Sequence, residues 1–286
     1  MTIIAALRNA VDTLQNAGIP DPHTDAGLLL SHVTGFPRMA LPLHGNQSLS
    51  NEQVQQLSSL LLSRASRKPL QYLLGEAHFF GRSFMVNERV LIPRPETEAL
   101  CELAIRFLRQ SVNLFPAPQV LDLCTGSGAI AVTLAREHPA SQVTATDISE
   151  AALAVAQANA GRHQVQVRFL EGDLFSPVQG MRFHCIACNP PYVESAACST
   201  LQEEVLREPL LALDGGSDGL DFYRRTADEA ADFLYPGGLL CMEIGDTQAD
   251  AVCALFSREK RYMDISVHPD LSGTPRVVCA YAFSPT

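Results

Sequence analysis

The sequence predicts an α/β protein, in which a parallel sheet with helices on both faces follows a small all-helical domain. From Val120 onward, short apolar strand-like runs alternate with segments of helical periodicity, and this alternation is typical of parallel sheets. Residues 1–75, by contrast, show helical periodicity alone. With 286 residues, 47% of them hydrophobic, the chain is long and apolar enough for one large and one small core.

Residues 1–75 carry three sets of helix signals and no evident catalytic residue. Apolar residues at helical spacing predict a first helix over residues 4–14 that ends near Gly18. Asp21 can cap a second helix with Pro22 at its first position, and residues 50–53 have the spacing of a capping box before a third. We interpret three basic residues that close this block as favourable charge at a helix C-terminus rather than as a partner-binding patch; they are Arg64, Arg67 and Lys68.

A β-hairpin linker is predicted over residues 76–93, with two short strands around a turn at Gly81. The second domain is expected over residues 94–286 and begins with a helix around residues 100–107. Its predicted strands cover residues 120–124, 142–147, 165–173, 183–188, 238–244, 261–267 and 275–283. Its other predicted helices cover residues 129–137, 150–160, 220–234 and 248–256.

Composition restricts the kind of partner and the compartment. The formal net charge of −10 argues against direct nucleic-acid binding, which relies on clustered Lys and Arg, and favours a protein or small-molecule partner. The eight cysteines lie mostly inside apolar runs, as reduced thiols do in cytoplasmic proteins. Cys185 and Cys188 form a CxxC, but positions i and i+3 of a strand point to opposite faces, so we expect no metal site. No signal peptide or membrane-spanning run is evident, and a soluble, cytoplasmic protein is expected.

Polar or glycine residues follow four of the predicted strands. They are the glycine turn after residue 123, Asp147, Asp173 and Asn189. Because parallel sheets bind ligands outside the carboxyl ends of their strands, this shared placement predicts one composite site.

The turn Asp122-Leu123-Cys124-Thr125-Gly126-Ser127-Gly128 leads from the first of these strands into a helix. Its two glycines let a ligand approach backbone N–H groups at the helix start. Asp147 can accept both hydroxyls of a ribose, although an acid 147 − 126 = 21 residues after Gly126 also suits a dinucleotide. The charge of Asp122 would repel a pyrophosphate and attract the sulfonium and ammonium groups of S-adenosylmethionine. We therefore favour S-adenosylmethionine over NAD.

Asp173 and Leu174, after the third strand, are placed to flank an adenine. Asp173 could accept a hydrogen bond from its exocyclic amine, and Leu174 could cover one face of the ring. A simple strand-end turn at Gly172-Asp173 is the alternative.

The tetrapeptide Asn189-Pro190-Pro191-Tyr192 follows the fourth strand. Its prolines have no N–H group and favour an extended backbone, so this segment offers carbonyl acceptors and almost no donors. With the side-chain oxygen of Asn189 and the flat ring of Tyr192, it suits a planar group that carries an NH2. An ordinary strand exit is the alternative interpretation.

Over nearly its whole length the chain resembles the release-factor glutamine methyltransferases (PrmC, also called HemK). The resemblance rests on the helical N-terminal block, on Asn189–Tyr192 and above all on Leu91-Ile92-Pro93-Arg94-Pro95-Glu96-Thr97-Glu98. It extends to Glu208-Pro209, Gly215-Gly216-Ser217-Asp218-Gly219-Leu220, Pro236-Gly237-Gly238, Glu243-Ile244-Gly245 and Arg276. One departure is Cys124, where members of the family usually have Gly. If that position needs a positive φ, the cysteine is strained there.

The resemblance implies a Rossmann-like class I methyltransferase domain with a mostly parallel sheet whose last strand is antiparallel. It implies N5-methylation of the glutamine in the Gly-Gly-Gln motif of class 1 release factors, with S-adenosylmethionine as cofactor and no metal. Asn189 and the Pro190 carbonyl would hold the amide nitrogen, and Tyr192 would pack on the amide plane. We assign cofactor contacts to Asp122, Cys124, Thr125, Gly126, Ser127, Gly128, Asp147, Asp173, Leu174 and Asn189, and substrate contacts to Asn189, Pro190, Pro191 and Tyr192. By analogy, residues 1–75 would dock the substrate.

Three alternatives remain open at the level of sequence. An adenine-N6 DNA methyltransferase shares the tetrapeptide, but the acidic balance counts against it. A relative could methylate a glutamine of a ribosomal protein instead. A non-catalytic cofactor-binding scaffold would leave the tetrapeptide without a role.

Overall fold

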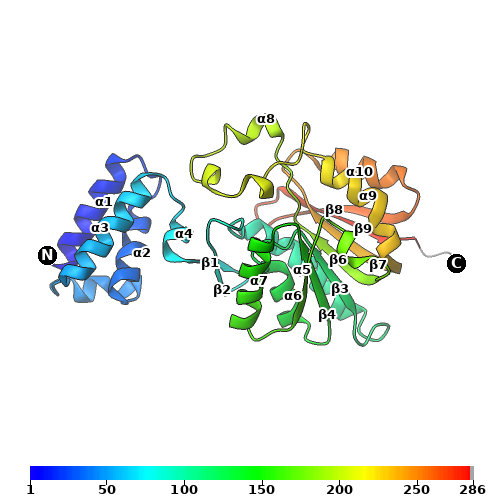
Figure 1. Ribbon diagram of the computed structural model, residues 1–286, viewed down its shortest axis with the longest axis horizontal. Coiled ribbons are helices and arrows are strands. Elements are labelled where there is room, and N and C mark those ends of the chain that lie inside the picture. Colours follow the sequence, from blue (N-terminus) through cyan, green and yellow to red (C-terminus); the bar gives the residue numbers. More distant parts are fainter. Residues whose placement is uncertain (284–286) are drawn as a thin grey trace. The chain divides into compact units, whose positions relative to one another are not determined.

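The structure is a computed structural model that describes residues 1–283 of the chain, and it divides into two compact units (Figure 1). The first unit consists of Met1–Glu76 together with Gln202–Arg207. The second unit consists of Ala77–Leu201 and the chain from Glu208 onward. No signal in the sequence indicated that residues 202–207 would belong with the helical unit.

The first unit is all-helical, and the predicted caps are confirmed. The Asp21 side chain accepts a hydrogen bond from Thr24 N–H at 3.2 Å, and Ser50 and Gln53 form a complete capping box. Leu14, Leu29 and Leu30 lie fully buried in its core. Its helices are α1 (Ile3–Asn16), α2 (Pro22–Thr34), the 3-10 turn η1 (Arg38–His44), α3 (Asn51–Ala65), α4 (Leu70–Leu74) and the 3-10 turn η4 (Val205–Arg207).

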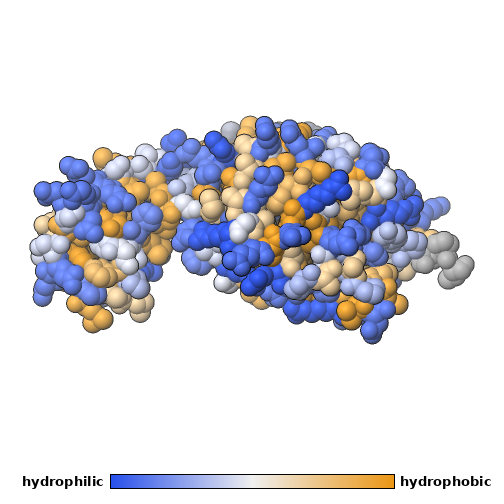
Figure 2. Space-filling model, turned by 60° about the horizontal axis from the view of Figure 1, so that its bottom comes forward, coloured by the Kyte–Doolittle hydropathy of each residue, from blue (hydrophilic) through white to orange (hydrophobic). Residues whose placement is uncertain are grey.

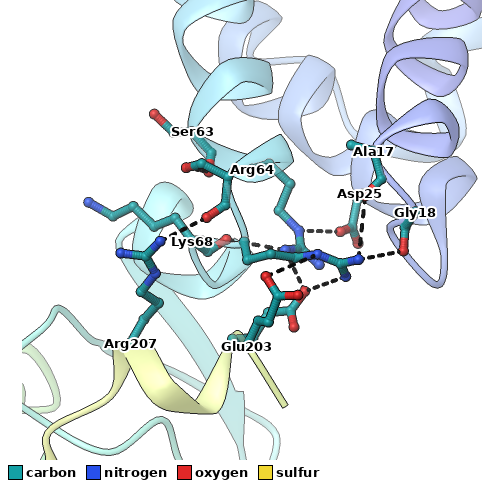
Figure 3. A network of polar contacts seen from close by, with 11 residues as sticks. Ala17, Gly18, Asp25, Ser63, Arg64, Lys68, Glu203 and Arg207 are labelled. Carbon is teal, nitrogen blue, oxygen red and sulfur yellow. Dashed lines mark hydrogen bonds and ion pairs between the residues drawn. The ribbon is translucent and has the colours of Figure 1, made fainter.

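A buried arginine joins three parts of this unit (Figure 3). Arg64 Nε lies 2.7 Å from Asp25 Oδ2, and Arg64 Nη1 lies 2.9 Å from Glu204 Oε1. Arg67 adds a contact of 3.3 Å to the same carboxylate and donates to Gly18 O at 2.9 Å. Arg64 does lie in the last turn of α3, and Arg67 donates to carbonyl groups at the end of α1, as expected of charge at a helix C-terminus. The sequence did not show that both guanidinium groups also bind carboxylates from elsewhere in the sequence.

The second unit contains the predicted hairpin and α/β domain. The hairpin strands β1 (Glu76–Phe79) and β2 (Arg82–Met85) meet at Phe80 and Gly81, which both have positive φ. The sheet strands are β3 (Gln119–Leu123), β4 (Gln142–Asp147), β5 (Val167–Glu171), β6 (Phe183–Cys188), β7 (Leu234–Glu243), β8 (Tyr262–Pro269) and β9 (Pro275–Ala282). The helices are α5 (Glu98–Gln110), α6 (Ala129–Glu137), α7 (Glu150–Arg162), α8 (Ser195–Cys198), α9 (Asp221–Phe233) and α10 (Ala249–Arg258), with short 3-10 turns η2 (Pro95–Thr97), η3 (Ser176–Val178) and η5 (Leu210–Ala212).

The seven strands form one sheet in the order β5-β4-β3-β6-β7-β9-β8. The pairs from β5 to β7 are parallel, whereas β9 runs antiparallel to both β7 and β8. This confirms a mostly parallel sheet with an antiparallel last strand. Helices α5, α6 and α7 contribute to the core on one face, and α9 and α10 contribute to the core on the other (Figure 1).

Strand boundaries differ from the prediction at β7 and β5. β7 begins at Leu234 rather than residue 238, because Leu234 pairs with Phe183 before the register shifts. β5 covers only Val167–Glu171. Cys185 and Cys188 face opposite cores, as predicted, and all eight cysteines are free thiols. None of the described helices is long and apolar enough to cross a membrane.

Replacing Arg64 by Ala should lower the free energy of unfolding by about 3 kcal/mol, because it leaves the Asp25 carboxylate buried without its cation. Thermal and urea unfolding followed by circular dichroism measure this loss. Arg207→Ala is the matched control, since Arg207 is exposed and donates a hydrogen bond to Ser66 O at 3.1 Å. Equal losses in the two variants would contradict the importance of the buried pair.

Candidate active site

One cavity opens where four parallel strands end. It is bordered by the segments that follow β3, β4, β5 and β6, which the sequence predicted would meet. Of the predicted site residues, Cys124, Thr125, Gly126, Ser127, Asp147, Asp173, Leu174, Asn189 and Pro191 line it. Other lining residues are Leu91, Pro93, Arg94, Thr97, Ile148, Leu211, Phe222 and Arg225.

The glycine turn is held by its own hydrogen bonds. Thr125 N–H donates to Thr146 O at 3.0 Å, Gly128 N–H donates to Thr125 O at 2.8 Å, and Gly126 N–H donates to Asp147 Oδ2 at 2.8 Å. These three N–H groups of the turn are thus taken up by protein oxygens, and the expected approach of a ligand to N–H groups at the helix start stays a prediction for the remaining ones. Both glycines have a positive φ, 54° at Gly126 and 79° at Gly128, and glycine adopts this backbone conformation without strain.

The two glycines differ in what surrounds them. A Cβ on Gly128 would lie 2.9 Å from the Cβ of Ala156 in α7, so this glycine permits α6 and α7 to approach each other. A Cβ on Gly126 would meet nothing within 4 Å. Gly126 therefore leaves open the space on the cavity side of the turn.

Cys124 has a φ of 58°, so the strain expected from the departure at this position is present. A residue with a Cβ costs about 1 kcal/mol in the left-handed region. Cys124 lines the cavity. Burial first, and the neighbouring Cys124 second, raise the pKa of the Cys188 thiol.

Asp122 lies on the inner side of the glycine turn, away from the cavity, and not where a ligand would approach the turn. The side chain is fully buried and does not line the cavity. Its Oδ2 accepts hydrogen bonds from Thr125 Oγ1 at 2.6 Å and from Ala131 N–H at 3.0 Å. Burial raises the pKa of Asp122 to about 7, against the lowering effect of these two bonds. The structure thus corrects the expected orientation, and Asp122 ties the turn to the start of α6.

Asp147 faces the cavity with both oxygens fixed. Oδ2 accepts the Gly126 N–H bond, and Oδ1 accepts from Ser149 N–H at 2.9 Å. Burial raises the pKa of this carboxyl, and the two backbone bonds oppose that effect. Each carboxylate oxygen has a further lone pair, so the pair of oxygens can accept two hydroxyl groups.

Asp173 and Leu174 lie on the β5 side of the cavity. Leu174 is buried and has a φ of 45°, which turns an apolar side chain into the lining. Asp173 is exposed and forms an ion pair of 2.7 Å with Arg225 of α9. Sequence reasoning missed Arg225, because only tertiary structure brings α9 to this strand end.

Asn189 presents a fixed amide. Its Nδ2 donates to Thr97 Oγ1 at 3.2 Å, which leaves Oδ1 as the end of the amide that can accept from a ligand. Pro190 is buried and is not among the residues that line the cavity. The ring of Tyr192 does not line the cavity either, and its hydroxyl donates to Glu243 Oε1 at 3.4 Å. The structure thus shows a contact of Tyr192 with a buried carboxyl group, and its packing on a substrate amide stays a prediction.

Two further residues of the family motifs support this edge. Glu208, itself buried, accepts a hydrogen bond from Ile92 N–H at 2.9 Å and pairs with Arg94. Both Arg94 and the neighbouring Pro209 line the cavity. Over residues 1–283, the structure contains no cluster of His, Cys, Asp or Glu suited to a metal ion.

The sheet order and the placement of the cavity at the strand ends are those of a class I methyltransferase fold. The fold is similar to that of a methyltransferase from Pyrococcus furiosus, with 19% identity, a TM-score of 0.53, and 82% of this chain and 100% of that chain covered. It is also similar to the hMettl16 catalytic domain, with 14% identity, a TM-score of 0.58, and coverages of 89% and 91%. Family models described as the PrmC N-terminal domain and the methyltransferase small domain match residues 5–75 and 101–219.

Relatives with higher sequence identity show to which family of methyltransferases the chain belongs. The chain is 42% identical over 266 residues to a release factor glutamine methyltransferase of Geobacter sulfurreducens, covering 93% of this chain and 91% of that protein. It is 44% identical over 260 residues to one of Gloeobacter violaceus, with coverages of 90% and 89%. The chain therefore belongs to the family of release factor glutamine methyltransferases, as the resemblance indicated.

The two glycines of the turn offer a matched test of these contacts. Gly128→Ala should destabilise the fold by about 3 kcal/mol, because it combines a positive φ with an unrelieved clash against α7. Gly126→Ala should cost only about 1 kcal/mol, since its Cβ meets open space. Urea unfolding of both variants measures the difference, and equal losses would show that Ala156 does not limit the packing.

Proposed function

We propose that this protein transfers a methyl group from S-adenosylmethionine to the amide nitrogen of the glutamine in the Gly-Gly-Gln motif of class 1 release factors. The observation that carries the proposal is Asn189, whose Nδ2 is held by Thr97 while its amide oxygen stays available at the cavity. Family membership supports the choice of a glutamine as the acceptor.

The residues around the cavity fit the proposed cofactor. Asp147 can accept the two ribose hydroxyls, and the apolar Leu174 can cover an adenine face. Gly126 leaves room at the turn for the rest of the molecule. NAD fits less well, because the Thr125, Gly126 and Gly128 N–H groups, which would bind a pyrophosphate, already donate to protein oxygens. The cofactor, when bound, supplies an electrophilic methyl group on its sulfonium.

An amide nitrogen is a weak nucleophile, because its lone pair is delocalised into the carbonyl. We infer that the Asn189 side-chain oxygen accepts one hydrogen bond from the substrate NH2 and that the Pro190 carbonyl accepts the other, although Pro190 does not line the cavity in this structure. These two acceptors would orient the nitrogen and favour its pyramidal form, which exposes the lone pair. The enzyme's contribution is thus positioning and electrostatic stabilisation rather than a covalent intermediate.

An adenine amine could use the same two acceptors, so the cavity alone does not separate a protein substrate from DNA. The net charge of −10 disfavours a long phosphate-binding surface. A ribosomal-protein glutamine would satisfy the same chemistry and is distinguished only by the assay below. The reduced state of the eight cysteines and a substrate of the translation apparatus support action in the cytoplasm.

Incubation with labelled S-adenosylmethionine should place label on an intact class 1 release factor and on a Gly-Gly-Gln peptide, but not on Gly-Gly-Ala, DNA or a ribosomal protein. Asn189→Ala should reduce methyl transfer by about 100-fold or more, since it removes one of two positioning acceptors. Cofactor affinity, measured by calorimetry, should change by only a few fold. Label on DNA alone, or undiminished turnover by the variant, would exclude the assigned roles.

We also propose that residues 1–75 dock the body of the release factor. On the visible face of this unit, apolar side chains lie scattered among hydrophilic ones (Figure 2). Two of the most exposed apolar side chains belong to η1, with Met39 89% and Leu43 86% accessible. Met39 and Leu43 belong to one short turn, and exposed apolar side chains that form a contiguous patch are typical of protein-binding surfaces.

The double variant Met39→Glu, Leu43→Glu should raise KM for an intact release factor by about 10-fold or more, because it places charges in a predicted apolar contact. Turnover of a short Gly-Gly-Gln peptide should remain as in the wild type, since the cavity is untouched. Steady-state kinetics on the two substrates measure this difference. Parallel losses on both would contradict a docking role, and unchanged KM would place docking elsewhere.

A further inference from the structure

The side-chain amide of Gln248 joins three segments of the second unit, one of which is the tetrapeptide at residues 189–192. Its Nε2 donates to Tyr192 O at 3.0 Å and to Gly219 O at 3.2 Å, and its Oε1 accepts from Gly245 N–H at 2.9 Å. A backbone carbonyl can only accept a hydrogen bond, and a backbone N–H can only donate one. These three partners therefore allow a single orientation of the amide, and both of its hydrogens are used.

Three glycines permit this close contact between backbone segments. A Cβ on Gly215 would lie 2.7 Å from Tyr192 Cα and 2.9 Å from Pro191 O. A Cβ on Gly219 would overlap with Tyr192 O, and one on Gly245 would lie 3.0 Å from the Oε1 atom that the Gly245 N–H contacts. Backbone atoms cannot rotate away as a flexible side chain can, so the region around Tyr192 is tightly packed. All three glycines belong to sequence motifs that the cavity itself does not explain.

The tetrapeptide is held at both ends and is stiff in between. On its N-terminal side, β6 ends at Cys188, which pairs with both neighbouring strands. On its C-terminal side, Gln248 holds Tyr192 O, and Val193 forms backbone hydrogen bonds of 2.9 and 2.8 Å with residues 213 and 215. The two successive prolines between these ends each fix φ at about −65°. Because so few dihedral angles are free, a shift of Tyr192 also changes the direction of Asn189.

The place of Gln248 in its own helix does not account for these contacts. The half-buried Gln248 is the N-cap residue of α10, but its side chain forms no capping hydrogen bond with that helix. Its two amide hydrogens go instead to carbonyl groups that precede it by 56 and 29 residues. The side chain therefore serves the segments around the tetrapeptide rather than the start of α10.

We propose that Gln248 is a positioning residue, which holds Tyr192 O and thereby sets the direction of the Asn189 amide at the cavity. The inference rests on the proposed function, because this direction matters only if Asn189 accepts a hydrogen bond from a substrate NH2. Neither Gln248 nor Tyr192 lines the cavity. Loss of their contact should therefore slow methyl transfer without weakening the binding of the cofactor.

The test compares Gln248→Met and Gln248→Glu with Gln119→Met, on the Gly-Gly-Gln peptide and on an intact release factor. Methionine removes all three hydrogen bonds at similar length, whereas glutamate keeps an acceptor for Gly245 N–H and loses the donors to Tyr192 O. Gln119 is the matched control, because it is a half-buried glutamine at the opposite end of β3, where its Nε2 donates to Gln142 Oε1 at 2.8 Å. Both Gln248 variants should lower kcat by about 10- to 100-fold, and Gln119→Met should stay within about 2-fold of wild type.

Two further readouts separate positioning from a general effect on the fold. Cofactor affinity, measured by calorimetry, should stay within about 3-fold of wild type in both Gln248 variants, which also shows that they are folded. In a double-mutant cycle, Gln248→Met should lower kcat by no more than about 3-fold when Asn189 is already replaced by Ala, because the amide that it positions is gone. A general loss of structure would instead add its full effect to that of Asn189→Ala.

Three results would overturn the inference in an active wild type. They are a wild-type kcat in either Gln248 variant, a fall in cofactor affinity that matches the fall in kcat, and an equal effect of Gln248→Met with and without the Asn189 side chain. A wild type that transfers no methyl group to the release factor or the peptide would instead contradict the proposed function.

Discussion

The site depends on the register of three neighbouring parallel strands. Leu123, the last residue of β3, pairs with Thr146 of β4 on one side and with Cys188 of β6 on the other. The glycine turn, Asp147 and Asn189 therefore leave the sheet at the same level, although Asp122 and Asn189 are far apart in the sequence. A slip of one residue in either pairing would turn every side chain to the opposite face. The strand register therefore determines where the cavity forms, and individual side chains then determine what it can bind.

Two buried carboxyl groups, those of Asp122 and Glu243, lie on one face of the sheet. Asp122 ties the glycine turn to α6 through Thr125 and the Ala131 N–H, and Glu243 accepts a hydrogen bond from the Tyr192 hydroxyl. Burial raises the pKa of each to about 7. Apolar residues of similar size would be cheaper to bury, but they could not fix the direction of a hydroxyl or an N–H group.

The sequence was sufficient wherever a local signal determines the structure. The caps at Asp21 and Ser50, the turn at Gly81 and the alternation from Val120 onward are properties of adjacent residues, and the structure confirms them. It was insufficient where tertiary contacts decide. Glu204 pairs with Arg64 across 140 positions, Arg225 reaches Asp173 across 52, and Asn189 reaches Thr97 across 92. The side chain of Asp122 was misplaced for the same reason, since its direction follows from the packing of α6 on β3.

The chemistry of the cavity does not by itself select a protein substrate. Two oxygens that accept hydrogen bonds from a planar NH2 serve an adenine as well as a glutamine, and the surrounding apolar lining distinguishes them weakly. Discrimination must then arise from what delivers the NH2 group to Asn189. A net charge of −10 repels a polyanion at long range, and this repulsion acts before any contact in the cavity is made. A folded protein that presents a single exposed glutamine avoids that cost, because it needs no phosphate-binding groove. If the proposed function holds, selectivity depends first on access and docking of the substrate, and the alignment of the NH2 group by Asn189 follows.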